Sequence, residues 1–316
     1  IAIRRPHKPA EEFAATDLFA IDTRFSPEAQ AQTPPLNYYS GFPVDLDINS
    51  RLTSGGHYVY PRLTGGSFLK TETTDAEVAS PSAMFESNVG LSPGFTNSED
   101  TTKQSFMWRR APGYFDVVCY EGDGVNGRAL PHKLGVAPEM IWVKNRTNAN
   151  NWVAWHSALN ITTESLILNA DTATGVPASA TTGWFTQAAT ATHIYPVNYQ
   201  GINQSPHDYI AYLFATVPGI SKVGSYTGNG GNQDIDCGFT NGARFVLIKR
   251  TDSTGNWMVF DTVRGISISD SPKLKLNSTD AEVSGGHIRP YSAGFTVTAN
   301  ISASDNNGEF IFLAIA

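Results

Sequence analysis

The alternation of apolar and polar positions predicts a strand, a polar turn and a second strand in the C-terminal third of the chain. In residues 243–250, apolar side chains occupy both the odd and the even positions, so both faces of the predicted strand are apolar. This is typical of a central strand that is covered on both faces. Residues 251–256 are polar and include Gly255, as expected of a turn. Residues 257–261 are again mainly apolar. The same order occurs at residues 140–156, and this recurrence indicates an internal repeat.

The repeat divides the chain into three copies. The third copy covers residues 218–316 and the second covers residues 111–217; each runs from a Pro-Gly pair to an apolar closing strand. A more divergent first copy covers residues 7–110. Residues 1–6 resemble a closing strand, so we expect them to be the last strand of a missing upstream repeat.

Each copy offers about seven short strands joined by turns that carry Gly and Asn, and helical periodicity is nearly absent. This pattern predicts an all-β fold of tandem antiparallel β-sandwich repeats. The linkers between copies have almost no length. We therefore expect the sandwiches to lie end to end, in a rod with little hinge freedom.

Composition and charge exclude several classes of function. The 316 residues are 41% hydrophobic and 16% charged, which is enough to build packed cores. The formal net charge of −7 argues against a nucleic-acid partner, because phosphate contacts require clustered Lys and Arg. No apolar run approaches the roughly 20 residues of a membrane helix, so no membrane partner is expected. Cys119 and Cys237 lie in non-equivalent strands and indicate no disulfide framework.

The sequence contains no recognisable catalytic constellation. It lacks a Gly-x-Ser-x-Gly elbow, a His-Glu-x-x-His pair and a phosphate-binding loop. Asp116, Glu121 and Asp123 could supply a pair of hydrolytic carboxylates, but their counterparts in the third copy are not acids. We therefore predict no catalytic residues, no metal site, no cofactor and no enzymatic activity.

The second copy carries a longer loop than the third, at residues 188–207, and long loops often carry function. Its amphipathic and uncharged side chains suit contact with a glycan or a protein. The residues expected to make that contact are Tyr195, Asn198, Tyr199, Gln200 and Asn203. In the alternative reading, the loop packs on a neighbouring repeat or another subunit, and the two tyrosines seal the junction with the third copy.

Trp152 and Trp257 recur at equivalent positions of the second and third copies. Recurrence at a fixed strand position is what packing in a core produces. We therefore predict that both are buried structural residues. Removing Trp257 should destabilise the third copy without affecting the second, apart from some propagation through interfaces that the copies share.

Several longer phrases carry a family resemblance. They lie at residues 110–118 (RAPGYFDVV), 130–135 (LPHKLG) with 138–141 (PEMI), 218–223 (PGISKV) and 274–282 (LKLNSTDAE). At these residues the chain resembles the tandem β domains of tail-fibre and other appendage proteins of marine cyanophages and related tailed bacteriophages. The resemblance extends over nearly the whole chain.

The resemblance implies a non-enzymatic structural module of a phage virion appendage, in a tail fibre or capsid fibre, that contributes to host attachment. It implies assembly in the host cytoplasm and a final location in the extracellular phage particle. Its partners would be other virion proteins and a host surface receptor, and the chain would form a homo-oligomer, with a trimer expected from the symmetry of phage fibres. One alternative is a dedicated receptor-binding adhesin for a host surface glycan or protein. A less favoured one is a polysaccharide depolymerase.

Overall fold

The apolar patterns become strands in the structure, a computed structural model that describes residues 13–79, 85–92, 102–175, 183–299 and 307–316. Regular structure in these residues is almost entirely β. The exceptions are the short helix α1 (Pro27–Gln30) and the 3-10 turns η1 (Ala15–Asp17) and η2 (Arg62–Thr64). The predicted all-β fold is therefore confirmed. The expected strand at residues 1–6 lies outside the described residues.

The first copy forms two antiparallel sheets. Its strands are β1 (Phe19–Thr23), β2 (Tyr38–Tyr39), β3 (Leu46–Arg51), β4 (His57–Pro61), β5 (Leu69–Lys70), β6 (Gly90–Leu91) and β7 (Lys103–Trp108). The main sheet has five strands in the order β1-β7-β3-β4-β5, and β2 pairs with β6 in the small sheet.

The second copy repeats this arrangement. Its strands are β8 (Phe115–Glu121), β9 (Leu130–Pro131), β10 (Met140–Asn145), β11 (Val153–His156), β12 (Leu166–Ile167), β13 (His193–Ile194) and β14 (Asp208–Phe214). The main sheet has the order β12-β11-β10-β14-β8, and β13 pairs with β9.

The third copy has the same main sheet and a larger small sheet. Its strands are β15 (Ser221–Thr227), β16 (Gln233–Asp236), β17 (Phe245–Arg250), β18 (Met258–Asp261), β19 (Leu274–Lys275), β20 (Ile288–Tyr291), β21 (Gly294–Val297) and β22 (Glu309–Ile315). The main sheet has the order β15-β22-β17-β18-β19, and the small sheet the order β16-β21-β20.

The strand registers show which residues are equivalent. Every residue of β10 and of β17 is buried, as their unbroken apolar patterns predict. Each of these strands pairs on both sides, with the closing strand and with the next strand of the hairpin. In the first copy, β3 pairs with β4 and β7 in the same registers. Three positions can therefore be matched across the copies: Ser50 with Lys144 and Lys249, His57 with Trp152 and Trp257, and Gln104 with Ile210 and Ile311.

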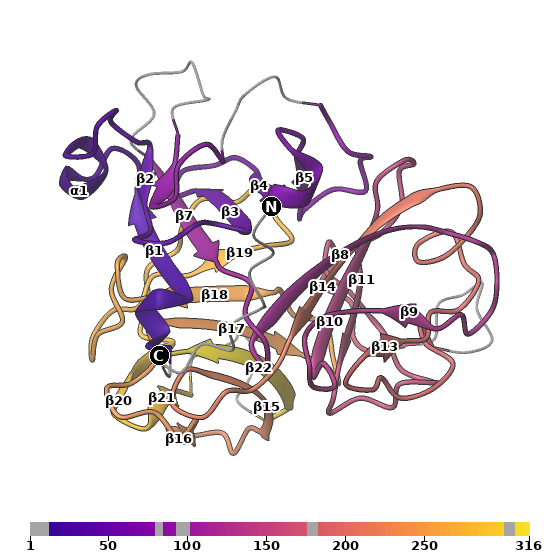
Figure 1. Ribbon diagram of the computed structural model, residues 1–316. Coiled ribbons are helices and arrows are strands. Elements are labelled where there is room, and N and C mark those ends of the chain that lie inside the picture. The colour runs from indigo at the N-terminus through magenta and orange to yellow at the C-terminus, as the bar shows by residue number, and fades with distance from the viewer. Residues whose placement is uncertain (1–12, 80–84, 93–101, 176–182, 300–306) are drawn as a thin grey trace.

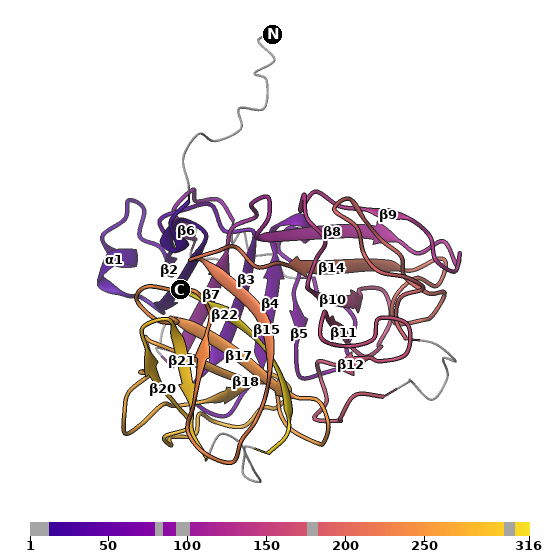
Figure 2. The same cartoon turned by 90° about the horizontal axis from the view of Figure 1, so that it is seen from below.

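The three main sheets pack around one shared apolar core. Figures 1 and 2 show the three sheets grouped together. Trp108 of the first copy lies 5.6 Å from Phe245 of the third and 6.5 Å from Phe115 of the second, measured between ring centroids. Trp142 of the second copy lies 6.5 Å from Trp257 of the third. Each copy therefore contacts both of the others.

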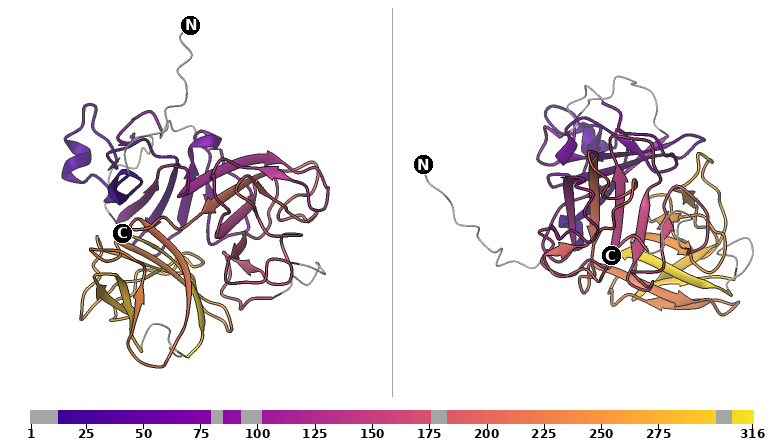
Figure 3. Two further views of the ribbon diagram at one scale, coloured as in Figure 1. Left: turned by 60° about the horizontal axis from the view of Figure 1, so that its bottom comes forward. Right: turned by 90° about the vertical axis from the view of Figure 1, so that its right-hand side faces the viewer.

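The expected end-to-end rod is therefore wrong, because the first and third copies lie side by side (Figure 3). The central strands β10 and β17 of the second and third copies are buried along their whole length, so both faces of these main sheets are covered. The small sheet of a copy covers only the outer face of its main sheet, as the separate cluster around Phe295 and Phe312 shows in the third copy. Closure around a common centre buries the inner faces of all the main sheets, whereas a rod would leave inner faces exposed to water.

Among the described residues, no helix has the length and apolar character that a membrane crossing requires.

Candidate functional site

The loop predicted to contact a partner packs on the second copy. Tyr195 is half-buried, and its ring centroid lies 6.4 Å from that of His193. Its carbonyl accepts a hydrogen bond from the backbone N–H of Thr186 at 3.0 Å. Asn198 is exposed, and its backbone N–H donates to Asn126 Oδ1 at 3.1 Å.

The middle of the loop is anchored through its backbone. Tyr199 is half-buried with its ring 5.4 Å from Trp184, and its carbonyl accepts from the N–H groups of the next turn. The side chain of Gln200 is exposed, but its carbonyl accepts from Asn145 Nδ2 at 2.8 Å and from the Tyr209 hydroxyl at 2.9 Å. These contacts fix the loop against β10 and β14.

Asn203 joins the loop to the turn after β8. It is fully buried, and its Nδ2 donates to Asp123 Oδ1 at 2.9 Å and to the Val125 carbonyl at 3.0 Å. Its side chain therefore positions the loop. Of the predicted contact residues, only Asn198 and Gln200 have exposed side chains.

The ring contacts of Tyr195 and Tyr199 are made within the second copy. The contacts between copies are found elsewhere. Each main sheet has a short edge strand, β5, β12 or β19, and the loop after this strand lies against another copy. These loops are residues 71–78, 168–174 and 276–283. We call these contacts the first–second, second–third and third–first seams. Figure 2 shows β5 next to the main sheet of the second copy, and Figure 1 shows β19 next to β3 and β4.

Backbone hydrogen bonds of the same pattern hold the three seams. In each seam, one N–H from a hairpin turn donates to a loop carbonyl, and one N–H from the loop donates back to the hairpin. The bonds from the hairpins are Asn150 N to Thr74 O at 2.8 Å, Gly255 N to Asp171 O at 2.7 Å and Gly55 N to Thr279 O at 2.9 Å. The bonds from the loops are Glu77 N to Arg146 O at 2.9 Å, Thr174 N to Thr251 O at 2.8 Å and Glu282 N to Leu52 O at 2.8 Å.

Tryptophan indoles add a side-chain bond to two of the seams. Trp152 Nε1 donates to the Lys70 carbonyl at 2.7 Å, and Trp257 Nε1 donates to the Ile167 carbonyl at 3.0 Å. Both side chains are buried, so the prediction of structural tryptophans is confirmed. They also bridge copies, however. The bond from Trp257 to the second copy leads us to expect that removal of Trp257 affects the second copy directly.

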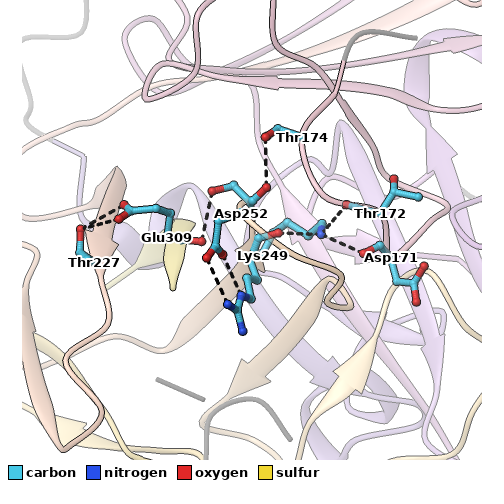
Figure 4. A network of polar contacts seen from close by, with 9 residues as sticks. Asp171, Thr172, Thr174, Thr227, Lys249, Asp252 and Glu309 are labelled. Atoms are coloured by element: carbon cyan, nitrogen blue, oxygen red, sulfur yellow. Dashed lines mark hydrogen bonds and ion pairs between the residues drawn. The ribbon is translucent and has the colours of Figure 1, made fainter. Parts of the chain in front are cut away.

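Buried lysines complete the same two seams. Lys249 Nζ donates to the carbonyls of Asp171 at 3.3 Å, Thr172 at 2.8 Å and Arg250 at 2.7 Å, as Figure 4 shows. Lys144 Nζ donates to the Thr74, Asn145 and Asn150 carbonyls at 3.0, 3.2 and 2.9 Å.

Burial lowers the pKa of Lys144 and of Lys249 to about 8. Both ammonium groups therefore remain mostly protonated at neutral pH, and three N–H donors meet three carbonyls. The repeat in the sequence places these lysines at equivalent positions, but we predicted no role for them. The available signal was a lysine at the same position of two strands, each preceded by four apolar residues.

The acids considered as hydrolytic carboxylates have structural roles or lie at the surface. Asp116 is buried, accepts from Arg110 Nη2 at 2.7 Å and accepts from the Lys133 N–H at 2.7 Å. Glu121 and Asp123 are exposed. Within the part of the chain that the structure describes, no group of three or more His, Cys, Asp or Glu residues is placed to hold a metal ion.

A cavity of about 900 Å³ lies where the starts of the three copies meet. Its wall includes the equivalent residues Leu18, Tyr114 and Ile220, together with Arg244. Arg244 Nε donates to the Ala316 carbonyl at 2.7 Å, and Arg244 Nη2 donates to the Phe19 carbonyl at 3.1 Å. This arginine therefore links the closing strand of the third copy to the first strand of the first copy.

Comparison with protein families gives one match. A family model described as "Domain of unknown function (DUF7483)" matches residues 69–316. The match begins at the first residue of β5, so it includes all three seam loops but excludes His57. No curated protein and no solved structure matches the chain significantly.

Proposed function

The chain belongs to the family described as Domain of unknown function (DUF7483), and we propose that it is a non-enzymatic structural module of a phage virion appendage, in a tail fibre or capsid fibre. The observation that carries this proposal is the closure of three copies around one core, in which each copy is hydrogen-bonded to the next. The phrases at residues 110–118 and 274–282 supply the resemblance to phage appendage proteins.

A closed ring suits a part that must keep its shape under load. In a linear array each repeat contacts only its neighbours, and an end repeat can open with the loss of one interface. Here each copy contributes a loop to one seam and a hairpin to another, so its release breaks two seams. If a seam opened, the lysine would exchange its bonds to carbonyls for bonds to water, and the aromatic surface of the tryptophan would be exposed to water.

Localisation in the particle tests this proposal. Particles of the virus that encodes the chain would be purified, labelled with gold-conjugated antibody against residues 13–316 and imaged by electron microscopy. The expected result is labelling of the tail or of capsid fibres, with no labelling of particles from a deletion mutant of the gene. Absence of the chain from purified wild-type particles, checked by mass spectrometry, would overturn the proposal.

Host attachment through the loop at residues 188–207 is a second candidate. It is favoured by the exposed amide side chains of Asn198 and Gln200 on a loop that Asn203 and Tyr199 already hold in place. A loop fixed before binding loses little conformational entropy when it binds.

The attachment candidate is tested by binding of the purified chain to host cells. Replacing Asn198 and Gln200 together with Ala should reduce binding by about 5- to 150-fold, because each lost amide removes a contribution of about 0.5–1.5 kcal/mol. Asn241→Ala, at an exposed amide of the third copy, is the matched control. Equal binding by the wild type, the double variant and the control would remove this candidate.

A further inference from the structure

The seam between the third and first copies differs from the other two. Where the other seams have a buried lysine and a tryptophan, this seam has Ser50 and His57. We propose that the third–first seam is an acid-labile joint, at which mild acid releases the first copy from the third. This inference does not depend on the proposed role in a virion.

Burial keeps His57 in its neutral form. The side chain is fully buried, with Nε2 3.1 Å from the Ser278 carbonyl and Nδ1 2.9 Å from Ser50 Oγ. A carbonyl can only accept, so Nε2 carries the proton and Nδ1 accepts from the Ser50 hydroxyl. A second proton would create a buried imidazolium in the middle of the seam.

No carboxylate among the described residues forms an ion pair with the His57 ring. Glu72 accepts a bond at 3.1 Å from the backbone N–H of His57, and burial raises the pKa of Glu72, so this carboxylate becomes neutral early as the pH falls. Lys275 faces the ring through its carbonyl, while its Nζ pairs with Asp280 at 2.6 Å.

The other charge near His57 opposes protonation. Arg264 is positive, and it is paired with Asp261 and with Glu282. Burial, with a further contribution from Arg264, lowers the pKa of His57 to about 4. The surroundings therefore favour the neutral ring.

A neighbouring polar residue weakens the packing at this seam. Gln104 pairs with Ser50 across β3 and β7 and is buried, and its amide atoms have no hydrogen-bond partner among the described residues. Ile210 and Ile311 occupy this position in the other copies. The third–first seam thus loses apolar contact and charge-assisted bonds that the other seams retain.

The lysine seams do not share this response to acid. Lys144 and Lys249 are protonated throughout the acid range, because even their lowered pKa is about 8. A second buried histidine, His156, has a pKa lowered to about 4 by burial and lies near the carbonyls of Gly224 and Phe312 in the third copy. It lies outside the second–third seam loop, at the far end of β11, so its contribution must be measured separately.

Hydrogen exchange at the equivalent seam amides tests the proposal in the full chain. The reporters are the N–H groups of Gly55 and Glu282 at the third–first seam. Their counterparts are Asn150 and Glu77 at the first–second seam, and Gly255 and Thr174 at the second–third seam. Protection factors, corrected for intrinsic exchange, would be compared between pH 7 and pH 4.5.

Titration of His57 should lower the protection of Gly55 and Glu282 by up to about tenfold for each pH unit between about 6.5 and about 4, since the open state binds one more proton at His57. The raised pKa of Glu72 acts in the opposite direction. The four reporters at the lysine seams should change less. His57→Gln retains a donor toward the Ser278 carbonyl without titrating, and it should abolish the steep fall at Gly55 and Glu282.

His156→Gln is the control and should leave the pH dependence of Gly55 and Glu282 unchanged. A parallel loss of protection at all six reporters in the wild type would overturn the proposal. Persistence of the steep fall in the His57→Gln variant would overturn it equally. The wild-type comparison decides the question even if a variant fails to fold.

Discussion

The second–third and third–first seams hold equivalent loops with different side chains. Both seams have the same pair of reciprocal backbone hydrogen bonds between hairpin and loop. Gly255 donates one of them in the second–third seam and Gly55 in the third–first seam. The second–third seam adds Trp257 and Lys249, whereas the third–first seam has His57 and Ser50. The backbone hydrogen bonds therefore set the geometry with which the copies close on one another. The side chains set the stability of each seam and its response to pH.

The largest effect is expected from removing an aromatic anchor of the second–third seam. Trp257→Ala should lower the free energy of unfolding by about 3–5 kcal/mol, because it deletes a fully buried indole. The loss should reach the second copy, since Trp257 Nε1 binds the Ile167 carbonyl. Urea unfolding gives the first quantity, and hydrogen exchange at residues 166–170 gives the second.

Phe295→Ala is the matched control for this experiment. Phe295 is also buried in the third copy, but it packs in that copy's own sandwich, against Phe312. It should destabilise the third copy while residues 166–170 keep more protection than in Trp257→Ala. If both variants expose residues 166–170 equally, Trp257 has no special role in the seam.

The buried lysine is the next largest contribution. Lys249→Met should destabilise the chain by about 2–3 kcal/mol, since it removes charge-assisted bonds to carbonyls at the second–third seam. Lys275→Met, which removes a largely solvent-screened pair with Asp280, should change stability by less than about 1 kcal/mol. Thermal unfolding of the two variants at one pH measures the difference. Equal effects would contradict a locking role for Lys249.

The third–first seam should respond to acid. An exposed imidazole has a pKa of about 6.5, and that of His57 is lowered to about 4. Between these values the unfolded chain binds the proton and the folded chain does not, so the free energy of unfolding falls as the pH falls. From pH 6.5 to pH 5 the loss assigned to His57 should be about 1.6 kcal/mol. Urea titrations of the wild type and His57→Gln at both pH values should differ by this amount.

The smallest effects are expected in the loop at residues 188–207, away from the seams. Asn203→Ala should cost about 1–2 kcal/mol, because it leaves buried partners without their bonds. Asn198→Ala, at an exposed position, should stay within about 0.5 kcal/mol. Thermal unfolding of the two single variants measures the contrast. A larger effect at Asn198 would mean that the exposed end of the loop has a structural role.

Much of the local fold could be predicted from the sequence. The apolar run at residues 243–250 indicated a central strand, and β17 is buried along its whole length with neighbours on both sides. Closure of the ring could not be predicted in the same way. A strand that is apolar on both faces must pack against another element on each face. The sequence pattern does not show whether the second packing partner is a sheet of the same copy or of another copy.

The candidate site shows a similar limit. The loop at residues 188–207 was recognisable by its length, but the burial of Asn203 depends on Asp123 and Val125, which are distant in the sequence. The role of His57 in the third–first seam could not be predicted, because the sequence of the first copy is divergent. Only the strand register shows that His57 is equivalent to Trp257. Hydrogen-bond partners of polar side chains are set by tertiary contacts, which a local pattern does not contain.

The central claim is that three copies share one core and unfold as one body. Differential scanning calorimetry of the full chain at pH 7 tests it most directly. We expect one transition with a ratio of calorimetric to van't Hoff enthalpy of about one. Separate transitions for individual copies, with a ratio well above about one, would show that the copies fold independently and do not form one cooperative unit.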